Sequence, residues 1–315
     1  MHDVEPRRLP TRTAERASRR AGIATALLLP AGLLAACGPG ETRDVGDVSA
    51  EPSDQEGMAE ERADHPAAGA GEPRSHWEVD GLTIRAMEPS PSYPDASLSL
   101  AAPEAGAELP SGEPLAFDFE VSGFELGAQT EGAAEKGLAN SANGQHIHLI
   151  LGTSPYSAHY EADFEQRVDP GYHVALAFLS RSWHESVKTP EASLVRELFV
   201  GTTPGAVERA DLDAPHLFYS RPKGTYTGED TERVMLDFYL VNADLSPDGY
   251  KVRATIDDRS VTFTRWVPYV IEGLPLGEVT IQLELLDEND ELVDSPLNPV
   301  VRKVTLEAAE GAEAM

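Results

Sequence analysis

The chain has 315 residues, with 54 acidic and 25 basic side chains and a formal net charge of −29 at pH 7. That length is sufficient for two domains with separate cores, and the charge excludes nucleic acid as a partner, because no basic region is large enough to neutralise phosphates. The single cysteine, Cys37, excludes intramolecular disulfides, cysteine-clustered zinc sites and a cysteine nucleophile in the folded region.

Residues 1–36 have the pattern of a targeting segment. Six arginines precede an apolar run, Ala21 to Ala36, which is short and is interrupted by Pro30. The run ends in the sequence LAAC at positions 34–37. This resembles the bacterial lipobox, in which the cysteine is acylated, for example with palmitate, and becomes the mature N-terminus. The resemblance implies a lipoprotein anchored in the cell envelope, on the periplasmic or extracellular face of a membrane; the alternative is a secretory signal with an incidental cysteine.

Residues 37–75 are predicted to form a disordered acidic tether. The segment has no aromatic residue, and its only larger apolar residues are Val45, Val48 and Met58. Such a composition buries too little apolar surface to offset the entropy lost on ordering. The last residues, 307–315, are predicted to be a disordered tail.

From Trp77 onward the sequence changes to short alternating runs that are broken by turn residues. Trp77 to Met87 indicates a hairpin around the two-residue turn Asp80-Gly81. No long segment keeps a helical period, so the pattern predicts an all-β sandwich. Further strands are expected at residues 97–101, 115–121, 146–151, 172–179 and 194–200.

The second half of the chain repeats the first. PLAFDFEV at 114–121 aligns with RVMLDFYL at 233–240, and GQHIHLIL at 144–151 aligns with GYKVRATI at 249–256. Similarity in a constant order indicates two copies of one structural unit. We therefore predict two tandem immunoglobulin-like β-sandwiches, at residues 76–200 and 201–306, with a long loop inserted in the first at 123–144.

The segments VDPGYHVALAF, from Val168, and LPLGEVTIQLELLDEND, from Leu274, resemble the penultimate strand of bacterial immunoglobulin-like and fibronectin type III-like domains. The whole arrangement resembles uncharacterised bacterial envelope lipoproteins with tandem domains of this sort, some of them described as phosphopeptide-binding. The resemblance implies a binding or scaffolding module and no catalytic chemistry.

His146 and His148 form a His-x-His pair on one face of a predicted strand, about 7 Å apart along the chain. The second copy has Lys251 and Arg253 at these positions, which indicates a solvated face. Together with His184, the pair could bind a metal ion, zinc or copper. The alternative is that the histidines are ordinary surface residues.

A second candidate is the loop RSWHESVK at 181–188, a cationic and aromatic segment whose counterpart at 287–291 is acidic. It is predicted to bind a ligand, such as an anionic peptide or another envelope protein, through Arg181, Trp183, His184 and Lys188. The alternative is that Trp183 packs onto the sandwich. Immunoglobulin-like topology places this loop near His146 and His148. A fully buried Trp183, or His184 at the opposite end of the sandwich, would overturn both the ligand and the metal interpretations.

No GxSxG, HExxH, P-loop, GxGxxG or paired-carboxylate pattern is present in the sequence. We therefore expect a non-enzymatic binding or scaffolding module, with a metal-binding protein as the alternative and an enzyme as the third choice.

We expect Cys37 to be acylated and residues 1–36 to be absent from the mature protein, because a basic and then apolar segment leads into LAAC. The intact mass of the native protein tests this, and Cys37→Ser should release the chain from the membrane fraction. Cleavage at another position, or an unmodified Cys37, would contradict it.

Overall fold

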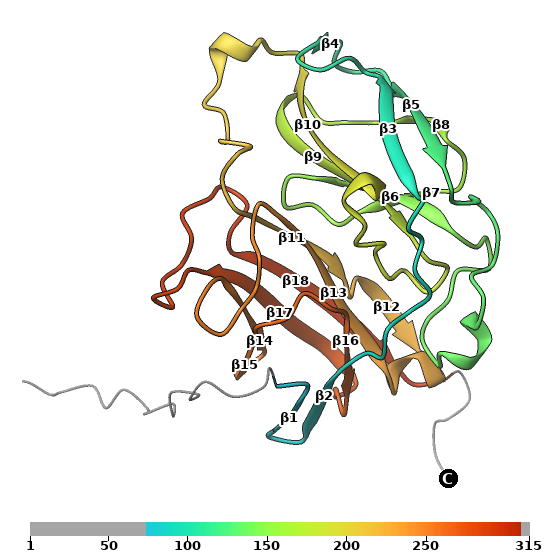
Figure 1. Ribbon diagram of the computed structural model, residues 1–315, viewed down its shortest axis with the longest axis vertical. Coiled ribbons are helices and arrows are strands. Elements are labelled where there is room, and N and C mark those ends of the chain that lie inside the picture. Colours follow the sequence, from blue (N-terminus) through green and yellow to red (C-terminus); the bar gives the residue numbers. More distant parts are fainter. Residues whose placement is uncertain (1–73, 310–315) are drawn as a thin grey trace, which may run out of the picture. The chain divides into compact units, whose positions relative to one another are not determined.

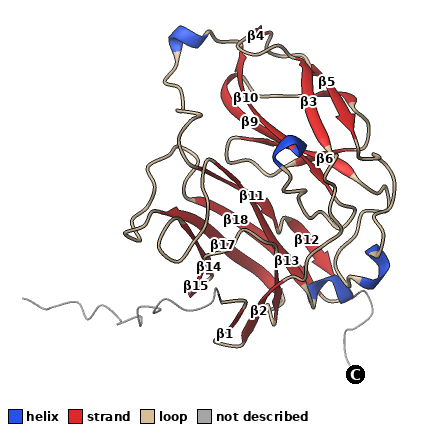
Figure 2. Cartoon of the chain, in the orientation of Figure 1, coloured by secondary structure: helices blue, strands red, loops and turns tan. Residues whose placement is uncertain are grey.

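The computed structural model describes residues 74–309 (Figure 1). The predicted signal segment, Cys37, nearly all of the tether and the end of the tail lie outside these residues. The described part is built from strands and four short 3₁₀ helices (Figure 2), so the prediction of an all-β protein is confirmed. Within it, no helix is long and apolar enough to cross a membrane. The four helices are η1 (Ala133–Glu135), η2 (Pro190–Ala192), η3 (Pro204–Ala206) and η4 (Gly228–Thr231).

The first sandwich has a three-stranded and a five-stranded sheet. The smaller sheet has the order β3 (Ser97–Ala102), β5 (Leu115–Ser122), β8 (Asp163–Gln166). The larger sheet has the order β4 (Glu108–Leu109), β10 (Ser193–Val200), β9 (Gly171–Ser180), β6 (His146–Leu151), β7 (Ser157–His159). The pairing of β4 with β10 is parallel, and the other pairings are antiparallel.

The second sandwich repeats this topology strand for strand. Its smaller set has the order β11 (His216–Arg221), β13 (Val234–Val241), β16 (Tyr269–Glu272). Its larger sheet has the order β12 (Gly224–Thr227), β18 (Val300–Glu307), β17 (Gly277–Leu286), β14 (Lys251–Ile256), β15 (Arg259–Phe263). The predicted repeat is therefore a repeat of structure, although the first strand of the second copy begins at residue 216 rather than near 201.

Alternation along the strands fills the two cores. In β5 the residues Leu115, Phe117 and Phe119 are buried between the sheets, whereas the residues between them are exposed. In β17 the residues Val279 and Ile281 are buried in the second core, and the residues that follow each of them are half-buried. A period of two places successive side chains on opposite faces of a strand, so each sheet has one apolar face for its own sandwich.

The N-terminal hairpin lies in the second sandwich, which corrects the predicted domain boundary at residue 76. Strand β1 (His76–Val79) pairs with β2 (Leu82–Ala86), and β2 pairs with β16, extending the smaller sheet of the second copy to five strands. The turn itself is as predicted, since Asp80 and Gly81 both have positive φ. Trp77 is buried edge-on against Phe263 and Tyr269, with ring centres 5.1 and 5.7 Å away. Sequence alternation shows that a hairpin forms but not which sheet edge it joins.

The two sandwiches are packed together through a third apolar cluster. Ile150, Leu176 and Phe178, on the outer face of the larger sheet of the first copy, contact Phe218 and Tyr239 of strands β11 and β13. The rings of Phe178 and Tyr239 are stacked, 5.0 Å apart. The outer face of β6 is therefore covered by the second sandwich, and the prediction that this face is solvated is wrong.

We expect Trp77→Ala to lower the free energy of unfolding by about 3–5 kcal/mol, because a large buried aromatic side chain leaves the second core. Urea unfolding of the purified protein measures the change. Replacing the exposed neighbour Glu78 with Ala should leave the transition nearly unchanged. Equal, small effects of the two substitutions would contradict the placement of the hairpin.

Candidate metal centre

Three histidine side chains converge where the two sandwiches meet. The Nε2 atoms of His146 and His148 lie 2.8 Å apart, and Nδ1 of His184 lies 3.1 Å from Nε2 of His146. One nitrogen from each ring falls within a set whose members are all within 4.8 Å of one another. His146 and His148 are fully buried and His184 is half-buried. The structure thus brings together the three residues that the sequence predicts as metal ligands.

The backbone of the fold produces this convergence. His146 and His148 occupy the outer face of β6, while Ile147 and Leu149 point into the first core. His146 pairs with Ser180 at the end of β9, and the turn after β9 returns His184 to the start of β6. That turn is closed by a hydrogen bond from His184 N to Arg181 O, 2.8 Å, with His184 in the left-handed region at φ 69°.

The left-handed turn belongs to the fold and is not special to the histidine. At the equivalent position of the second copy, Asp290 also has positive φ, 63°, and its amide donates to the carbonyl of Asp287. Asp tolerates this conformation well and His is several-fold enriched in it among non-glycine residues. The backbone of this turn is therefore alike in the two copies, and only the side chains that it carries differ.

The side chains that occupy these positions in the second copy satisfy one another. Lys251, equivalent to His146, donates to the carboxylate of Asp290, equivalent to His184, at 2.8 Å. Arg253, equivalent to His148, forms a bidentate pair with Glu284 at 2.7 and 2.9 Å. Two opposite-charge pairs thus stand where the first copy has three imidazoles and the ring of Phe178.

The hydrogen bonds around the cluster fix the lone pair of His146. Its Nδ1 lies 2.7 Å from the carbonyl oxygen of Gly144 and must donate to it, so Nε2 of a neutral His146 is an acceptor. This one lone pair faces both His148 Nε2 and His184 Nδ1. Nδ1 of His148 lies 3.5 Å from Ser220 Oγ, from β11 of the second sandwich. A histidine anchored by its second nitrogen to a carbonyl or hydroxyl is the usual arrangement of a metal ligand.

All three imidazoles are held neutral. Burial lowers the pKa of His146 to about 4, against the raising effect of its bond to Gly144, and the nearby charges of Arg221 and Lys223 lower it further. Burial is also the main cause of the lowered pKa of His148 and of His184, and the same two cations add to it in both cases. Neutral imidazole is the form that binds a transition metal.

Aromatic and polar residues that sequence reasoning missed complete the surroundings. The ring of Tyr156 stacks on that of His148, with centres 3.5 Å apart, and its hydroxyl lies 3.3 Å from His184 Nδ1. Tyr160 lies beside His146, at 5.0 Å between ring centres. Arg221 and Lys223 come from the second sandwich. No local motif marks these residues, because they reach the histidines only through the packing of one copy on the other.

The predicted recognition loop is not a surface feature, and that interpretation is corrected. Trp183 has 0% exposure and packs with Met235 and Val270 on the outer face of the second sandwich. Its indole donates to Glu185 at 2.7 Å, and Glu185 also pairs with the buried Arg181 at 3.2 Å. The loop covers the neighbouring sandwich and leaves no exposed aromatic patch for an anionic peptide.

The same loop ties the sandwiches together through a buried carboxylate. Asp237, fully buried on β13, accepts from the amide of Ser186 at 2.9 Å and from Lys188 at 2.6 Å. The fourth predicted ligand-binding residue, Lys188, is therefore occupied by an internal ion pair.

Burial of Trp183 does not count against the metal centre, contrary to the sequence-based criterion. The side chains of Trp183 and His184 leave the turn toward different partners: the indole toward Glu185, the imidazole toward His146 and Tyr156. The apolar packing of Trp183 anchors the turn that carries His184.

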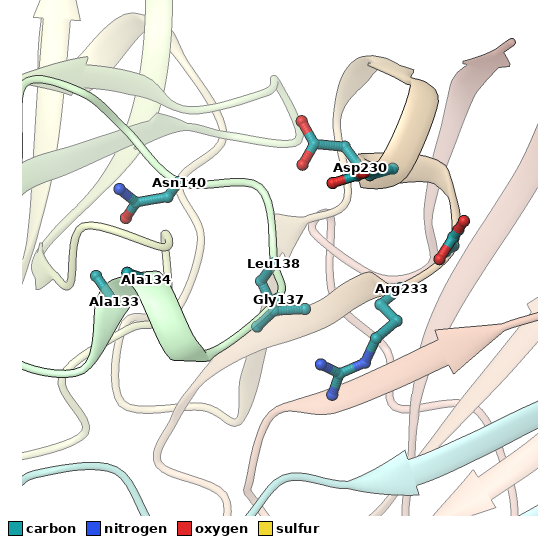
Figure 3. Close-up of a pocket in the computed structure, with 9 residues that line it drawn as sticks. Ala133, Ala134, Gly137, Leu138, Asn140, Asp230 and Arg233 are labelled. Carbon is teal, nitrogen blue, oxygen red and sulfur yellow. The ribbon is translucent and has the colours of Figure 1, made fainter. Parts of the chain in front are cut away.

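The inserted loop at 123–144 lies beside a hollow of about 420 Å³, formed with η4 of the second sandwich (Figure 3). Glu229, Asp230 and Glu232 line it together with Arg233, and none of the three histidines does. Leu138 from this loop packs with Trp183. The loop therefore serves the contact between the copies, and the hollow is separate from the metal centre.

No protein-family profile and no curated protein matches the chain. Among solved structures, the fibronectin(III)-like modules of Clostridium thermocellum CbhA are 12% identical, with 69% of this chain and 98% of that chain covered, at a TM-score of 0.25. SGBP-B of Bacteroides ovatus, in complex with a mixed-linkage heptasaccharide, is 10% identical over 66% of this chain and 47% of its own, at 0.19. The tandem V-type regions of VCBP3 are 7% identical over 67% and 99%, at 0.21. These neighbours are fibronectin III-like and immunoglobulin-like modules, and at such scores the likeness carries no argument about function.

We expect Asp237→Ala to cost about 3–5 kcal/mol of stability, because it leaves the Lys188 ammonium and the Ser186 amide without their buried acceptor. Denaturant unfolding measures it. The exposed pair Lys303–Glu278 supplies the control: Lys303→Ala should stay close to the wild type. A loss no larger than that of the control would show that Asp237 does not hold the loop.

Proposed function

We propose that this chain is a membrane-anchored envelope protein that binds one transition metal ion, zinc or copper, through His146, His148 and His184. The convergence of three imidazole nitrogens on one point carries the proposal. The metal-binding alternative is thereby preferred to the recognition loop, whose Arg181 and Trp183 are buried and whose Lys188 is held in an internal ion pair. The envelope location rests on the sequence LAAC at Cys37 and on nothing else.

The spacing of the nitrogens suits such an ion after a small adjustment. Zinc–imidazole bonds of about 2.0–2.1 Å place two tetrahedral ligand atoms about 3.3–3.4 Å apart. The observed separations of 2.8 and 3.1 Å are those of hydrogen-bonded rings. Binding an ion would lengthen these two separations by a few tenths of an ångström and bring the third pair of nitrogens, now within 4.8 Å, to a similar distance. The protons shared between the rings would move to the opposite ring nitrogens. The Nδ1 of His146 already donates to Gly144, so that ring keeps its tautomer.

The donor set restricts which metals fit. Three neutral imidazoles, without a thiolate or carboxylate among them, suit zinc and copper better than calcium or magnesium, which prefer oxygen ligands. Three protein ligands leave a position open on a four-coordinate ion.

Metal titration of the purified, chelator-treated protein tests the proposal. We expect one zinc or copper ion per chain by elemental analysis, and an unfolding temperature that rises with metal concentration, because an ion that binds only the folded state stabilises it by mass action. Calcium and magnesium should have no effect.

The second copy supplies a matched variant. His146→Lys combined with His184→Asp recreates the Lys251–Asp290 pair, so it should fold while losing metal affinity by roughly 100-fold or more. His159→Gln, which changes a half-buried histidine on β7 outside the cluster, is the control and should bind normally. Equal binding by the double variant and the control would overturn the proposal.

A further inference from the structure

Among the described residues, Arg221 is a buried cation without a counter-ion, close to the three histidines. It is 7% exposed, and its Nε finds no hydrogen-bond acceptor within residues 74–309. None of the ion pairs found in that range includes its guanidinium, which lies over two aromatic rings, at 5.6 Å from the ring centre of Tyr226 and 6.0 Å from that of Tyr156. The Tyr156 ring in turn stacks on His148. A guanidinium withdrawn from water without a counter-ion is costly unless something else compensates it.

The fold does not require this arginine. Residue Ala102 of the first copy occupies the position of Arg221, directly after the same strand irregularity, which follows the fourth paired residue in both strands. Similarly, Glu104 of the first copy stands where the second has Lys223. An immunoglobulin-like sandwich therefore folds here with a small or an acidic residue.

The charged side chains that affect all three histidines are two cations. The positive charges of Arg221 and Lys223 each lower the pKa of His146, His148 and His184. Lys223 also lies 3.7 Å from the centre of the Tyr156 ring and donates to the Tyr156 carbonyl. The nearest buried acids are already paired, Glu185 with Arg181 and Asp237 with Lys188. A metal cation added here would raise an already uncompensated positive charge.

From these observations, and resting on the proposed function, we infer that the metal binds together with a small anion, a carboxylate or inorganic anion, which takes the open coordination position and pairs with Arg221. The guanidinium supplies a fork of donors that matches an oxyanion. Lys223, which is half-buried, adds a second positive charge. Tight burial of Tyr156 and His148 limits the ligand to a few atoms.

Copper(II) is the probe for the test, because a bound azide ion adds a charge-transfer band to its spectrum. Copper stoichiometry is measured separately by electron paramagnetic resonance, and azide is then titrated into the copper-loaded chain, with acetate as competitor. We expect a saturable azide band that acetate removes. Arg221→Gln should bind one copper ion with azide affinity weakened roughly tenfold or more, as for a lost charge-assisted hydrogen bond.

Two further variants keep the result interpretable. Lys223→Gln changes a less buried cation and should also weaken azide binding. It therefore tests the inference even if Arg221→Gln fails to fold. Arg302→Gln removes another partly buried arginine over an aromatic ring, that of Tyr219, and should leave azide binding unchanged. Copper binding without an azide band, or equal azide affinity in all three variants, overturns the anion inference and leaves the metal site standing. Absence of copper binding overturns both.

Discussion

The contact on which the candidate site depends is the packing of the outer face of β6, β9 and β10 against β11 and β13. It places Phe178 on Tyr239 and at the same time withdraws His146 and His148 from water. Buried polar groups must find partners or cost free energy. The imidazoles find them in one another, in Gly144 and in Ser220 of the second sandwich. The first copy supplies all three histidines, and the second copy supplies the cover that buries them.

Much of the fold could be predicted from the sequence, because strand patterns and turn residues are local signals. The strand carrying His146, the Asp80-Gly81 turn and the repeat all have local signatures. The meeting of His184 with His146 was also predictable, since hairpin closure within one sheet determines it. Contacts between residues of the two different sandwiches could not be predicted. Alternation reveals that two faces of a strand differ, but it does not reveal that a second domain covers the outer one. For this reason the sequence leaves open whether Trp183 is exposed or packed.

The duplicated topology separates what the fold requires from what a single copy has added. Backbone pairing, the left-handed turn residue and the strand irregularity occur in both copies. The side chains at the equivalent positions differ: the second copy has ion pairs, and the first copy has neutral imidazoles. In the second copy Lys251 meets Asp290, an arrangement that is complete in itself. In the first copy His146 meets His184, and neutral imidazole nitrogens that share hydrogen bonds stand in place of the ion pair.

Electrostatics give the site a character opposite to that of the molecule. The chain carries a formal charge of −29, which attracts cations to its surface and repels anions. At the junction, however, neutral imidazoles stand beside Arg221 and Lys223, with the neighbouring acids already engaged. The long-range field therefore favours the arrival of cations, and Arg221 and Lys223 would favour an anion beside a metal ion bound at the junction. Since the ligands come from the first copy and the cations from the second, an occupied site draws on both, and the binding free energy adds to the stability of their contact.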